Sequence, residues 1–253
     1  MLRFGDIVFG PIHSRRLGSS LGINLLPRDG KLCNFDCIYC ECGWNRDGRV
    51  SAPVLPKAAD VRTALEKKLA ECREAGTGID SITFSGNGEP TLNPDFPEII
   101  DDVIALRNRY FPKAKVSVLS NATMAGKEEI FLALRKVDNP ILKIDAPADA
   151  GVAVINRPSG PYSLDSVISS LKRFDGDFIL QTMFLKGPGF DSSAEDSVKA
   201  WTDIVRELHP REVMVYTIDR ETPQKGLEKI SVERMAALVH PLVEEGFHVQ
   251  IRG

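Results

Sequence analysis

Four of the five cysteines lie within ten residues, from Cys33 to Cys42. Three of them, Cys33, Cys37 and Cys40, have the spacing C-x₃-C-x₂-C. An odd number of cysteines, in a chain whose first residues do not read as a secretory signal, argues against a disulfide framework. The array therefore indicates a metal site built on one loop.

Two kinds of metal site compete for this loop. Three closely spaced thiolates can hold three corners of a cubane iron–sulfur cluster, which leaves the fourth iron open to a ligand. Structural zinc usually takes two ligand pairs separated by a dozen or more residues, and the loop contains no histidine. The pattern favours the cluster, and a zinc-stabilised binding protein without catalysis is the alternative.

The two remaining cysteines are interpreted as non-ligands. Only Glu41 separates Cys42 from Cys40, so a bond from Cys42 to the same cluster would be strained. We expect Cys42 to lie beside the cluster. Cys72 falls in a helical pattern with apolar residues three or four positions apart, which indicates a place in the hydrophobic core.

Composition sets broad limits on the class of protein. The chain has 253 residues, of which 43% are hydrophobic and 26% charged, as in ordinary globular proteins. Its apolar runs are too short to cross a bilayer, and a cytoplasmic protein is expected. The net charge of −3 creates no general attraction to nucleic acid or anionic lipid. Arg15, Arg16 and Lys31 still form a possible local basic patch.

Short apolar runs alternate with helical patterns along most of the chain. Strands are predicted over residues 22–26, 79–84, 115–119, 141–144, 178–185 and 212–218, with a possible short strand at 247–251. Helices are predicted over residues 57–75, 94–107, 127–136, 164–174, 194–208 and 232–245. Asn93 is expected to cap the second helix, with Pro94 in its first turn.

Six βα units in succession predict a parallel sheet covered by helices. Eight units would close a barrel, so six predict an α/β fold with an open, partial (β/α)₆ TIM barrel. We expect one domain over residues 1–253, with a short N-terminal extension over about residues 1–20. Ligands bind such folds at the carboxyl ends of the strands. The site is therefore expected at that rim.

The distinctive polar residues fall at this rim. The cysteine loop follows the first strand, and Gly86, Asn87, Gly88 and Glu89 follow the second. Further candidates come from the ends of the next strands: Ser120, Asn121, Lys143, Asp145, Gln181 and Tyr216. Charged groups such as Lys143 and Asp145 are costly to bury without partners, which favours a functional role for them.

Several stretches together resemble the radical S-adenosylmethionine (radical SAM) superfamily. The cysteine array with Tyr39 before its last cysteine resembles the signature of that superfamily. A poorly characterised branch of Fe–S oxidoreductases, related to the wybutosine-synthesis radical enzymes that act on tRNA, is similar in further stretches: Ser14–Gly18, Ser20–Asn24, Phe84–Pro90, Lys143–Pro147 and Ile155–Pro158.

The resemblance implies a mechanism and a set of roles. Cys33, Cys37 and Cys40 would hold a [4Fe–4S] cluster that chelates SAM, and reductive cleavage of SAM would give a 5′-deoxyadenosyl radical that abstracts hydrogen from a substrate. Residues 86–89 stand in place of the family's GGE motif, which receives the methionine amino group, although Asn87 replaces its second glycine. The remaining implied SAM contacts are Tyr39, Ser120, Asn121, Lys143, Asp145 and Gln181.

The resemblance identifies the substrate far less well than the chemistry. A tRNA or nucleotide, a small molecule, a peptide and a protein to be activated are all considered, and the acidic net charge counts against a large RNA. No second cysteine set or flavodoxin-like domain is evident. The electron is therefore expected from a separate flavodoxin or ferredoxin.

Overall fold

The computed structural model describes residues 4–14, 17–47 and 52–253. The strands there are β1 (Val8–Ser14), β2 (Gly18–Ile23), β3 (Ser81–Phe84), β4 (Lys115–Ser120), β5 (Asn139–Lys143), β6 (Ile179–Met183), β7 (Leu185–Gly187), β8 (Phe190–Asp191), β9 (Glu212–Tyr216), β10 (Glu228–Lys229) and β11 (Val249–Arg252). The helices are α1 (Ala58–Glu74), α2 (Phe96–Tyr110), α3 (Glu128–Lys136), α4 (Asp149–Ile155), α5 (Leu164–Lys172), α6 (Glu195–Leu208) and α7 (Val232–Glu244), with a 3₁₀ turn at Pro90–Leu92.

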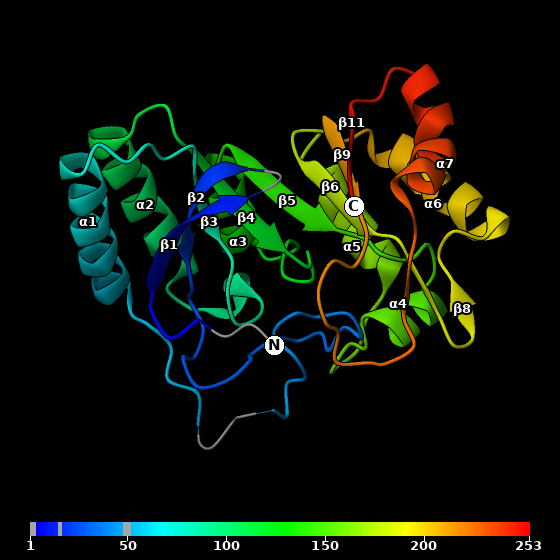
Figure 1. Cartoon of the computed structure of the whole chain (residues 1–253), viewed down its shortest axis with the longest axis horizontal. Coiled ribbons are helices and arrows are strands. Elements are labelled where there is room, and N and C mark those ends of the chain that lie inside the picture. The colour runs from blue at the N-terminus through cyan, green and yellow to red at the C-terminus, as the bar shows by residue number, and fades with distance from the viewer. Residues whose placement is uncertain (1–3, 15–16, 48–51) are drawn as a thin grey trace.

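One sheet runs through the molecule in the order β1-β2-β3-β4-β5-β6-β9-β11 (Figure 1). Every neighbouring pair from β2 to β11 is parallel, and β1 is antiparallel to β2. The six predicted strands correspond to β2, β3, β4, β5, β6 and β9, and the possible terminal strand is β11. Helices cover the outer face of a sheet that does not close on itself, so the predicted partial barrel is confirmed.

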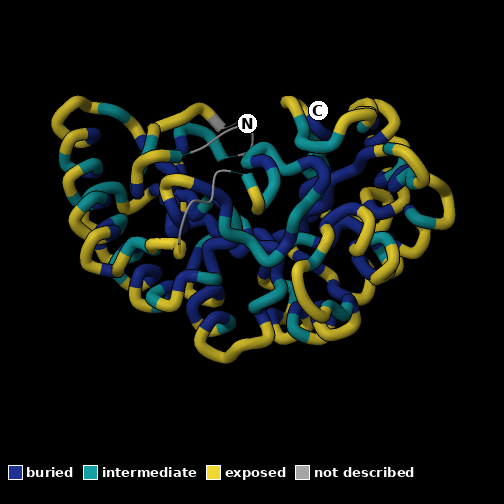
Figure 2. The backbone as a smooth tube through the Cα atoms, turned by 90° about the horizontal axis from the view of Figure 1, so that it is seen from below, coloured by how far each residue is buried: buried dark blue, intermediate teal, exposed yellow. Residues whose placement is uncertain are grey.

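The parallel strands are buried because helices cover their outer face. All four residues of β3 and all five of β6 are buried, as expected for strands between two layers. In α1, the face that carries Val61, Leu65, Leu69 and Cys72 is buried, which confirms the core position predicted for Cys72. Figure 2 shows buried backbone along the inside of the curved sheet and exposed residues mainly on the outer loops and helix faces.

Side-chain hydrogen bonds connect four neighbouring strands inside the sheet. The Ser20 hydroxyl lies 2.8 Å from that of Thr83, and Ser81 lies 3.0 Å from both Thr83 and Ser117. The Asn139 amide donates to the Ser117 hydroxyl at 3.1 Å. These bonds join β2, β3, β4 and β5 and help to fix their register, because a slip of one residue would move the hydroxyls to the opposite face.

The strand β1 lies within the segment predicted as an N-terminal extension. Its pairing with β2 is irregular between Phe9 and Ile12, where Pro11 stands. The Phe9 ring packs on Gly22, where an added Cβ atom would lie 2.2 Å from the ring. The assignment of residues 1–253 to one domain stays a prediction.

The cap predicted for the second helix is wrong. The helix α2 begins at Phe96 with Asp95 as its N-cap. The Asn93 side chain lies just before the helix, where its Oδ1 atom accepts from the Asp95 amide at 2.8 Å, and Pro94 precedes the first turn. Its amide group donates to the carbonyl oxygens of Leu25 and Pro56 at 3.0 and 2.9 Å. Asn93 thus fixes the start of the cysteine loop.

Besides β1, four short helices and strands did not follow from the sequence pattern. They are α4 and the small sheet β10-β7-β8, which lies in the segments around β6 and β9. No helix in the described parts of the chain is both long enough and apolar enough to pass through a bilayer.

Candidate active site

The three cysteines of the array line one cavity of about 230 Å³ at the carboxyl ends of the strands. We call it the thiol cavity. Of the predicted site residues, Tyr39, Gly86, Gly88, Glu89, Ser120, Asn121, Lys143 and Gln181 line it together with Cys33, Cys37 and Cys40. The structure therefore brings together residues that are as many as 148 positions apart in the sequence, from Cys33 to Gln181.

Two glycines allow the β3 loop to pack directly on the cysteine loop. The backbone amide of Leu32 donates to the Asn87 carbonyl at 2.8 Å, and the amide of Glu89 donates to the Leu32 carbonyl at 3.1 Å. A Cβ atom on Gly88 would lie 1.9 Å from the Leu32 oxygen, and both Gly86 and Gly88 have positive φ angles, of 132° and 138°. Only glycine adopts this conformation without strain.

The cysteine loop is closed by buried polar contacts. The ammonium group of Lys31, 3% exposed, donates to Asp36 Oδ1 and to the Gly43 carbonyl, both at 3.0 Å. The Asn45 side chain donates to the Cys33 and Phe35 carbonyls at 2.9 and 3.0 Å. These bonds hold the loop in place while its thiols face the cavity.

Amide groups donate toward two of the sulfur atoms. The Phe35 backbone amide lies 3.4 Å from Cys33 Sγ, and Asn121 Nδ2 lies 3.7 Å from the same atom. Asn156 Nδ2 lies 3.4 Å from Cys37 Sγ. Such donors stabilise negative charge on sulfur, and in iron–sulfur proteins they set the reduction potential.

The three thiols differ in acidity. Burial raises the pKa of Cys33 above its usual range and that of Cys37 to about 11. A hydrogen bond from the Cys42 side chain, with the positive charge of Lys31, lowers the pKa of Cys40 to about 6. Burial lowers the pKa of Lys31, but the three thiols outweigh it and raise the net value.

Cys42 lines the thiol cavity together with the three cysteines of the array. Its Sγ atom lies 3.2 Å from the Gly86 carbonyl oxygen. The hydrogen bond to Cys40, together with burial, raises the pKa of Cys42 far above its usual range. Because a thiol has one proton, Cys42 can donate a hydrogen bond either to the Gly86 carbonyl or to the Cys40 sulfur, but not to both at once.

Glu89 is a buried carboxylate, 3% exposed, at the wall of the cavity. Its Oε1 atom accepts hydrogen bonds from the Thr91 hydroxyl and amide at 2.6 and 3.1 Å, and from the Ser120 hydroxyl at 2.9 Å. Its Oε2 atom accepts from the Asn121 amide at 2.7 Å. Burial raises the pKa of Glu89 and outweighs these bonds. A cationic ligand in the cavity would stabilise its charged form.

Lys143 lines the cavity and lies between the hydroxyl groups of two tyrosines. Its ammonium group donates to the hydroxyls of Tyr39 and Tyr216, both at 2.8 Å, and lies 4.0 Å from Asp145 Oδ2. It also lies 4.9 Å from the centre of the Tyr39 ring. Burial lowers the pKa of Lys143, but Asp145 and Tyr216 reverse this and raise the net value. Lys143 thus stays protonated.

Asp145 is buried behind the cavity wall, where its carboxylate accepts hydrogen bonds from three neighbouring groups. Its Oδ2 atom accepts from the Tyr39 hydroxyl and from Asn156 Nδ2, the latter at 2.7 Å, and its Oδ1 atom accepts from the Met183 amide at 2.9 Å. Asp145 does not line the thiol cavity among the described residues. A direct contact of Asp145 with SAM stays a prediction, and its observed contacts fix Tyr39 and Asn156.

Two further sequence predictions are clarified by the structure. The Asn87 side chain points away from the cavity, because its amide donates to the Phe4 and Pro27 carbonyls at 2.9 and 2.8 Å. Only its backbone belongs to the loop wall. Gln181 does line the cavity, and its Nε2 atom is buried without a hydrogen-bond partner among the described residues. A ligand with an acceptor group would satisfy that donor.

Other residues were not assigned to the site from the sequence. Asn156 lies in a stretch already noted for its resemblance, and only its contacts with Cys37 and Asp145 reveal its role. Arg157 is positioned on Trp44, 5.0 Å from the ring centre, and donates to Gln224 at 2.8 Å. Arg15 and Arg16, two members of the predicted basic patch, lie outside the described residues.

Comparison with known proteins agrees with this geometry. The model of the radical SAM superfamily matches residues 29–191, more than half of the chain, and the match includes the whole cysteine array. The chain belongs to the radical SAM superfamily. A radical SAM enzyme is not a non-catalytic zinc protein, so that alternative is set aside.

Two known relatives are similar over most of this radical SAM chain. A UPF0026 protein of Methanocaldococcus jannaschii is 28% identical over 231 residues, which are 90% of this chain and 68% of that protein. A UPF0026 protein of Helicobacter pylori strain J99 is 29% identical over 228 residues, which are 87% of this chain and 68% of that protein.

Solved structures share the fold. A radical SAM methyltransferase from Sphaerobacter thermophilus matches with a TM-score of 0.69 and 16% identity, over 92% of this chain and 65% of that chain. Streptococcus suis SuiB bound to S-adenosylmethionine matches with a TM-score of 0.60 and 15% identity, over 88% of this chain and 45% of that chain. The present chain spans less than two thirds of the length of both proteins.

Archaeal TYW1 matches with a TM-score of 0.54 and 11% identity, over 89% of this chain and 71% of that chain. At this identity the likeness shows the fold alone. The relation to the wybutosine-synthesis branch stays a prediction.

Proposed function

We propose that this radical SAM enzyme holds a [4Fe–4S] cluster on Cys33, Cys37 and Cys40 and binds S-adenosylmethionine in the thiol cavity. The observation that carries the proposal is the common cavity that these three thiols share with Glu89 and Gln181. When bound, the cluster supplies one electron for the cleavage of S-adenosylmethionine to a 5′-deoxyadenosyl radical, which takes hydrogen from an organic substrate.

The donor set fits a cluster. Three sulfurs face one cavity from one loop. Lys31 supplies a buried positive charge beside them, and the amide groups near Cys33 and Cys37 point at sulfur. Thiolate charge is thus compensated on several sides. Without such compensation, burial of these charges would be costly.

The opposite wall fits S-adenosylmethionine. Glu89 offers a carboxylate for the amino group of that molecule, and its Oε2 atom has one protein donor, which leaves acceptor capacity. Gln181 offers an unpaired amide donor. Tyr39 and Tyr216, whose hydroxyls both accept from Lys143, form part of the wall.

The electron must come from a reductant, and we propose a separate low-potential flavodoxin or ferredoxin as the donor. A cytoplasmic location remains a prediction from the sequence. Among the substrate classes, we favour a small molecule over a large RNA, because the cavities are small.

The proposal is tested by anaerobic reconstitution with iron and sulfide, followed by ultraviolet–visible and EPR spectra. We expect about four irons per chain and slow formation of 5′-deoxyadenosine when dithionite and S-adenosylmethionine are added. Cys33→Ala, Cys37→Ala and Cys40→Ala should each abolish both. A colourless protein that binds zinc and no iron would disprove the proposal.

Two other cysteines provide matched controls for the same experiment. Cys72→Ala changes a thiol in the core of α1, away from the cavity, and should retain the iron. Cys42→Ala should retain it as well, because Cys42 is assigned as a neighbour of the cluster. Loss of iron in Cys42→Ala would show that the ligand assignment is wrong.

A further inference from the structure

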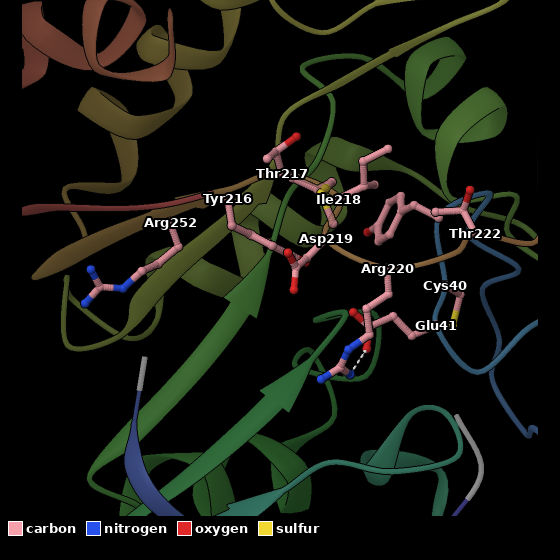
Figure 3. Close-up of a pocket in the computed structure, with 11 residues that line it drawn as sticks. Cys40, Glu41, Tyr216, Thr217, Ile218, Asp219, Arg220, Thr222 and Arg252 are labelled. Atoms are coloured by element: carbon pink, nitrogen blue, oxygen red, sulfur yellow. Dashed lines mark hydrogen bonds and ion pairs between the residues drawn. The ribbon is translucent and has the colours of Figure 1, made fainter. Parts of the chain in front are cut away.

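A second cavity, of about 220 Å³, lies beside the thiol cavity. We call it the β9 cavity, because residues 216–220, at the end of β9 and in the loop after it, form much of its wall (Figure 3). Met183 of β6 and Arg252 of β11 also line it. Tyr39, Cys40 and Tyr216 line both cavities. A molecule in the β9 cavity would therefore lie next to the proposed cofactors.

The charged residues of the β9 cavity are paired with one exception. Arg220 forms an ion pair with Glu41 at 2.6 Å, and Asp219 lies 3.8 Å from Lys229. Arg252 makes no hydrogen bond or ion pair with any residue in the described ranges, and its Nε atom is buried and unpaired. Among the described residues, Arg252 is thus the charged group of the wall that has no protein partner.

An unpaired guanidinium nitrogen is costly to bury, and a ligand that accepts a hydrogen bond from it would remove the cost. Guanidinium groups match carboxylate and phosphate oxygens better than any other ligand group. In Figure 3 the guanidinium of Arg252 extends away from Cys40, whereas the Arg220 side chain is turned toward Glu41. The free cation is therefore at the end of the cavity remote from the thiols.

We propose that the β9 cavity binds the substrate of this enzyme, and that the substrate is a small organic anion whose carboxylate or phosphate group is held by Arg252. The inference rests on the radical SAM function proposed above. With its anion at Arg252, the rest of the substrate lies along Met183, Ile218 and Tyr216, toward Cys40. That orientation presents carbon–hydrogen bonds to the side where the radical would form.

The size of the cavity limits the substrate. A volume of 220 Å³ equals about seven water molecules at liquid density. The group that enters is therefore of the size of an amino acid or a short hydroxy acid. The wall combines apolar groups, such as Met183 and Ile218, with the unpaired Nε atom of Arg252, which suits a short carbon chain that ends in an anion.

The inference is tested by isothermal titration of two anions into the reconstituted protein with S-adenosylmethionine present. The probes are glutarate, which is a carboxylate, and glycerol 3-phosphate. Glutaramide and glycerol are their neutral counterparts. We expect one of the anions to bind saturably and its neutral counterpart at least tenfold more weakly. The anion that binds identifies which group the site takes.

The role of Arg252 is tested with variants in the same titration. Arg252→Gln should weaken binding of that anion at least about tenfold, the loss expected for one charged hydrogen bond. Arg252→Lys keeps the charge and should retain part of the affinity, which separates charge loss from misfolding. The control is Arg62→Gln on α1, where Arg62 is exposed and paired with Asp102; it should bind as the unmodified protein does.

Failure of the inference is distinguishable from failure of the proposed function. If the protein takes up iron and cleaves S-adenosylmethionine but binds neither anion, or if Arg252→Gln binds as tightly as the unmodified protein, the anion site is disproved alone. If Arg252-dependent anion binding is found in a protein that takes up no iron, the radical function is disproved and the anion site stands.

Discussion

Asn156 joins the cluster loop to the network behind it. Its Nδ2 atom lies 3.4 Å from Cys37 Sγ and 2.7 Å from Asp145 Oδ2, and its backbone carbonyl accepts from the Asp36 amide at 2.8 Å. One side chain thus donates to a proposed iron ligand and to the carboxylate that holds Tyr39. A change at Asn156 should affect both redox behaviour and stability.

The Asn156→Ala variant should lower the reduction potential of the cluster, because Cys37 loses an amide donor that stabilises the added electron. It should also lower the free energy of unfolding by about 1–3 kcal/mol, because buried Asp145 loses a donor. An EPR-monitored redox titration and thermal unfolding would measure these effects. Asn108→Ala, at an exposed position of α2, is the control. An unchanged potential at full iron content would contradict the assignment.

At the scale of elements, the contact between the β3 loop and the cysteine loop depends on the absence of a side chain. The backbone bonds of Leu32 with Asn87 and Glu89 leave no space for a Cβ atom on Gly88. This contact positions Glu89 against the cysteines. Its disruption should therefore impair stability and cofactor binding together.

We expect Gly88→Ala to reduce the free energy of unfolding by about 1–3 kcal/mol or more, because its φ angle is strained for alanine and its Cβ atom clashes with backbone. Iron uptake should fall as well. Gly78→Ala is the matched control, because a Cβ atom there meets no atom within 4 Å. Thermal unfolding and iron analysis would measure both variants. Equal stability of the two variants would contradict this account.

Asp138 connects α2 to β4 and offers a pH-dependent test. Burial acts to raise the pKa of Asp138, but the Val116 amide at 2.9 Å, Arg107 at 2.7 Å and Lys115 at 3.2 Å outweigh it and hold the pKa below its usual value. A depressed pKa means that the ionised group stabilises the fold above its unfolded pKa, near 3.9. That stability is lost as the pH falls through the folded pKa.

Asp138→Asn should therefore be less stable than the unmodified protein at neutral pH, by about 1–2 kcal/mol, since Asp138 is partly exposed and solvent screens its ion pairs. The difference should stay constant above about pH 5 and shrink below about pH 4. Urea unfolding at several pH values would measure it. A difference that grows as the pH falls would contradict the sign of the shift.

The elements differ in how well the sequence predicted them. Buried parallel strands and long amphipathic helices were placed within a few residues, because burial imposes a clear period on them. The strand β1, the helix α4 and the sheet β10-β7-β8 are short or irregular and have no such period. The cap was misplaced by two residues, because the helix begins at Phe96 after Asp95. The partners of the Asn93 amide, Leu25 and Pro56, cannot be predicted from local sequence.

The sequence predicted the local motifs of the site better than the contacts between distant residues. The cysteine array and Glu89 were found because their spacing or resemblance is local in the chain. The hydrogen bonds of Lys143 to two tyrosines and of Asp145 to Asn156 join residues that lie apart in the sequence. The unpaired Nε atom of Arg252 likewise depends on what the fold places around it. Such contacts depend on the packing of the sheet, which a single sequence does not record.

At the scale of the whole molecule, the thiol cavity is lined by segments from Lys31 to Tyr216, which come from the loops and strands of most of the sheet. A ligand in it touches β4, β5, β6 and β9 as well as the cysteine loop. Binding should therefore stabilise the entire fold, because a ligand that binds only the folded state shifts the unfolding equilibrium.

With the cluster in place, S-adenosylmethionine at a hundred times its dissociation constant should stabilise the protein by about 2.7 kcal/mol. After a chelator has removed the iron, the same concentration should stabilise it much less, because part of the binding site is missing. Thermal unfolding with and without the ligand would measure both effects. Equal stabilisation in the two forms would place the binding of S-adenosylmethionine away from the cysteines.

An open barrel has two outermost strands, β1 and β11, whose unpaired backbone groups are a risk for self-association. On β1, Pro11 has no N–H group to offer, and the irregular pairing near it bends the strand. On β11, only four residues are in the strand and one of them is the charged Arg252. Both features oppose the addition of another chain's strand, so the open edges of the sheet are protected against edge-to-edge aggregation.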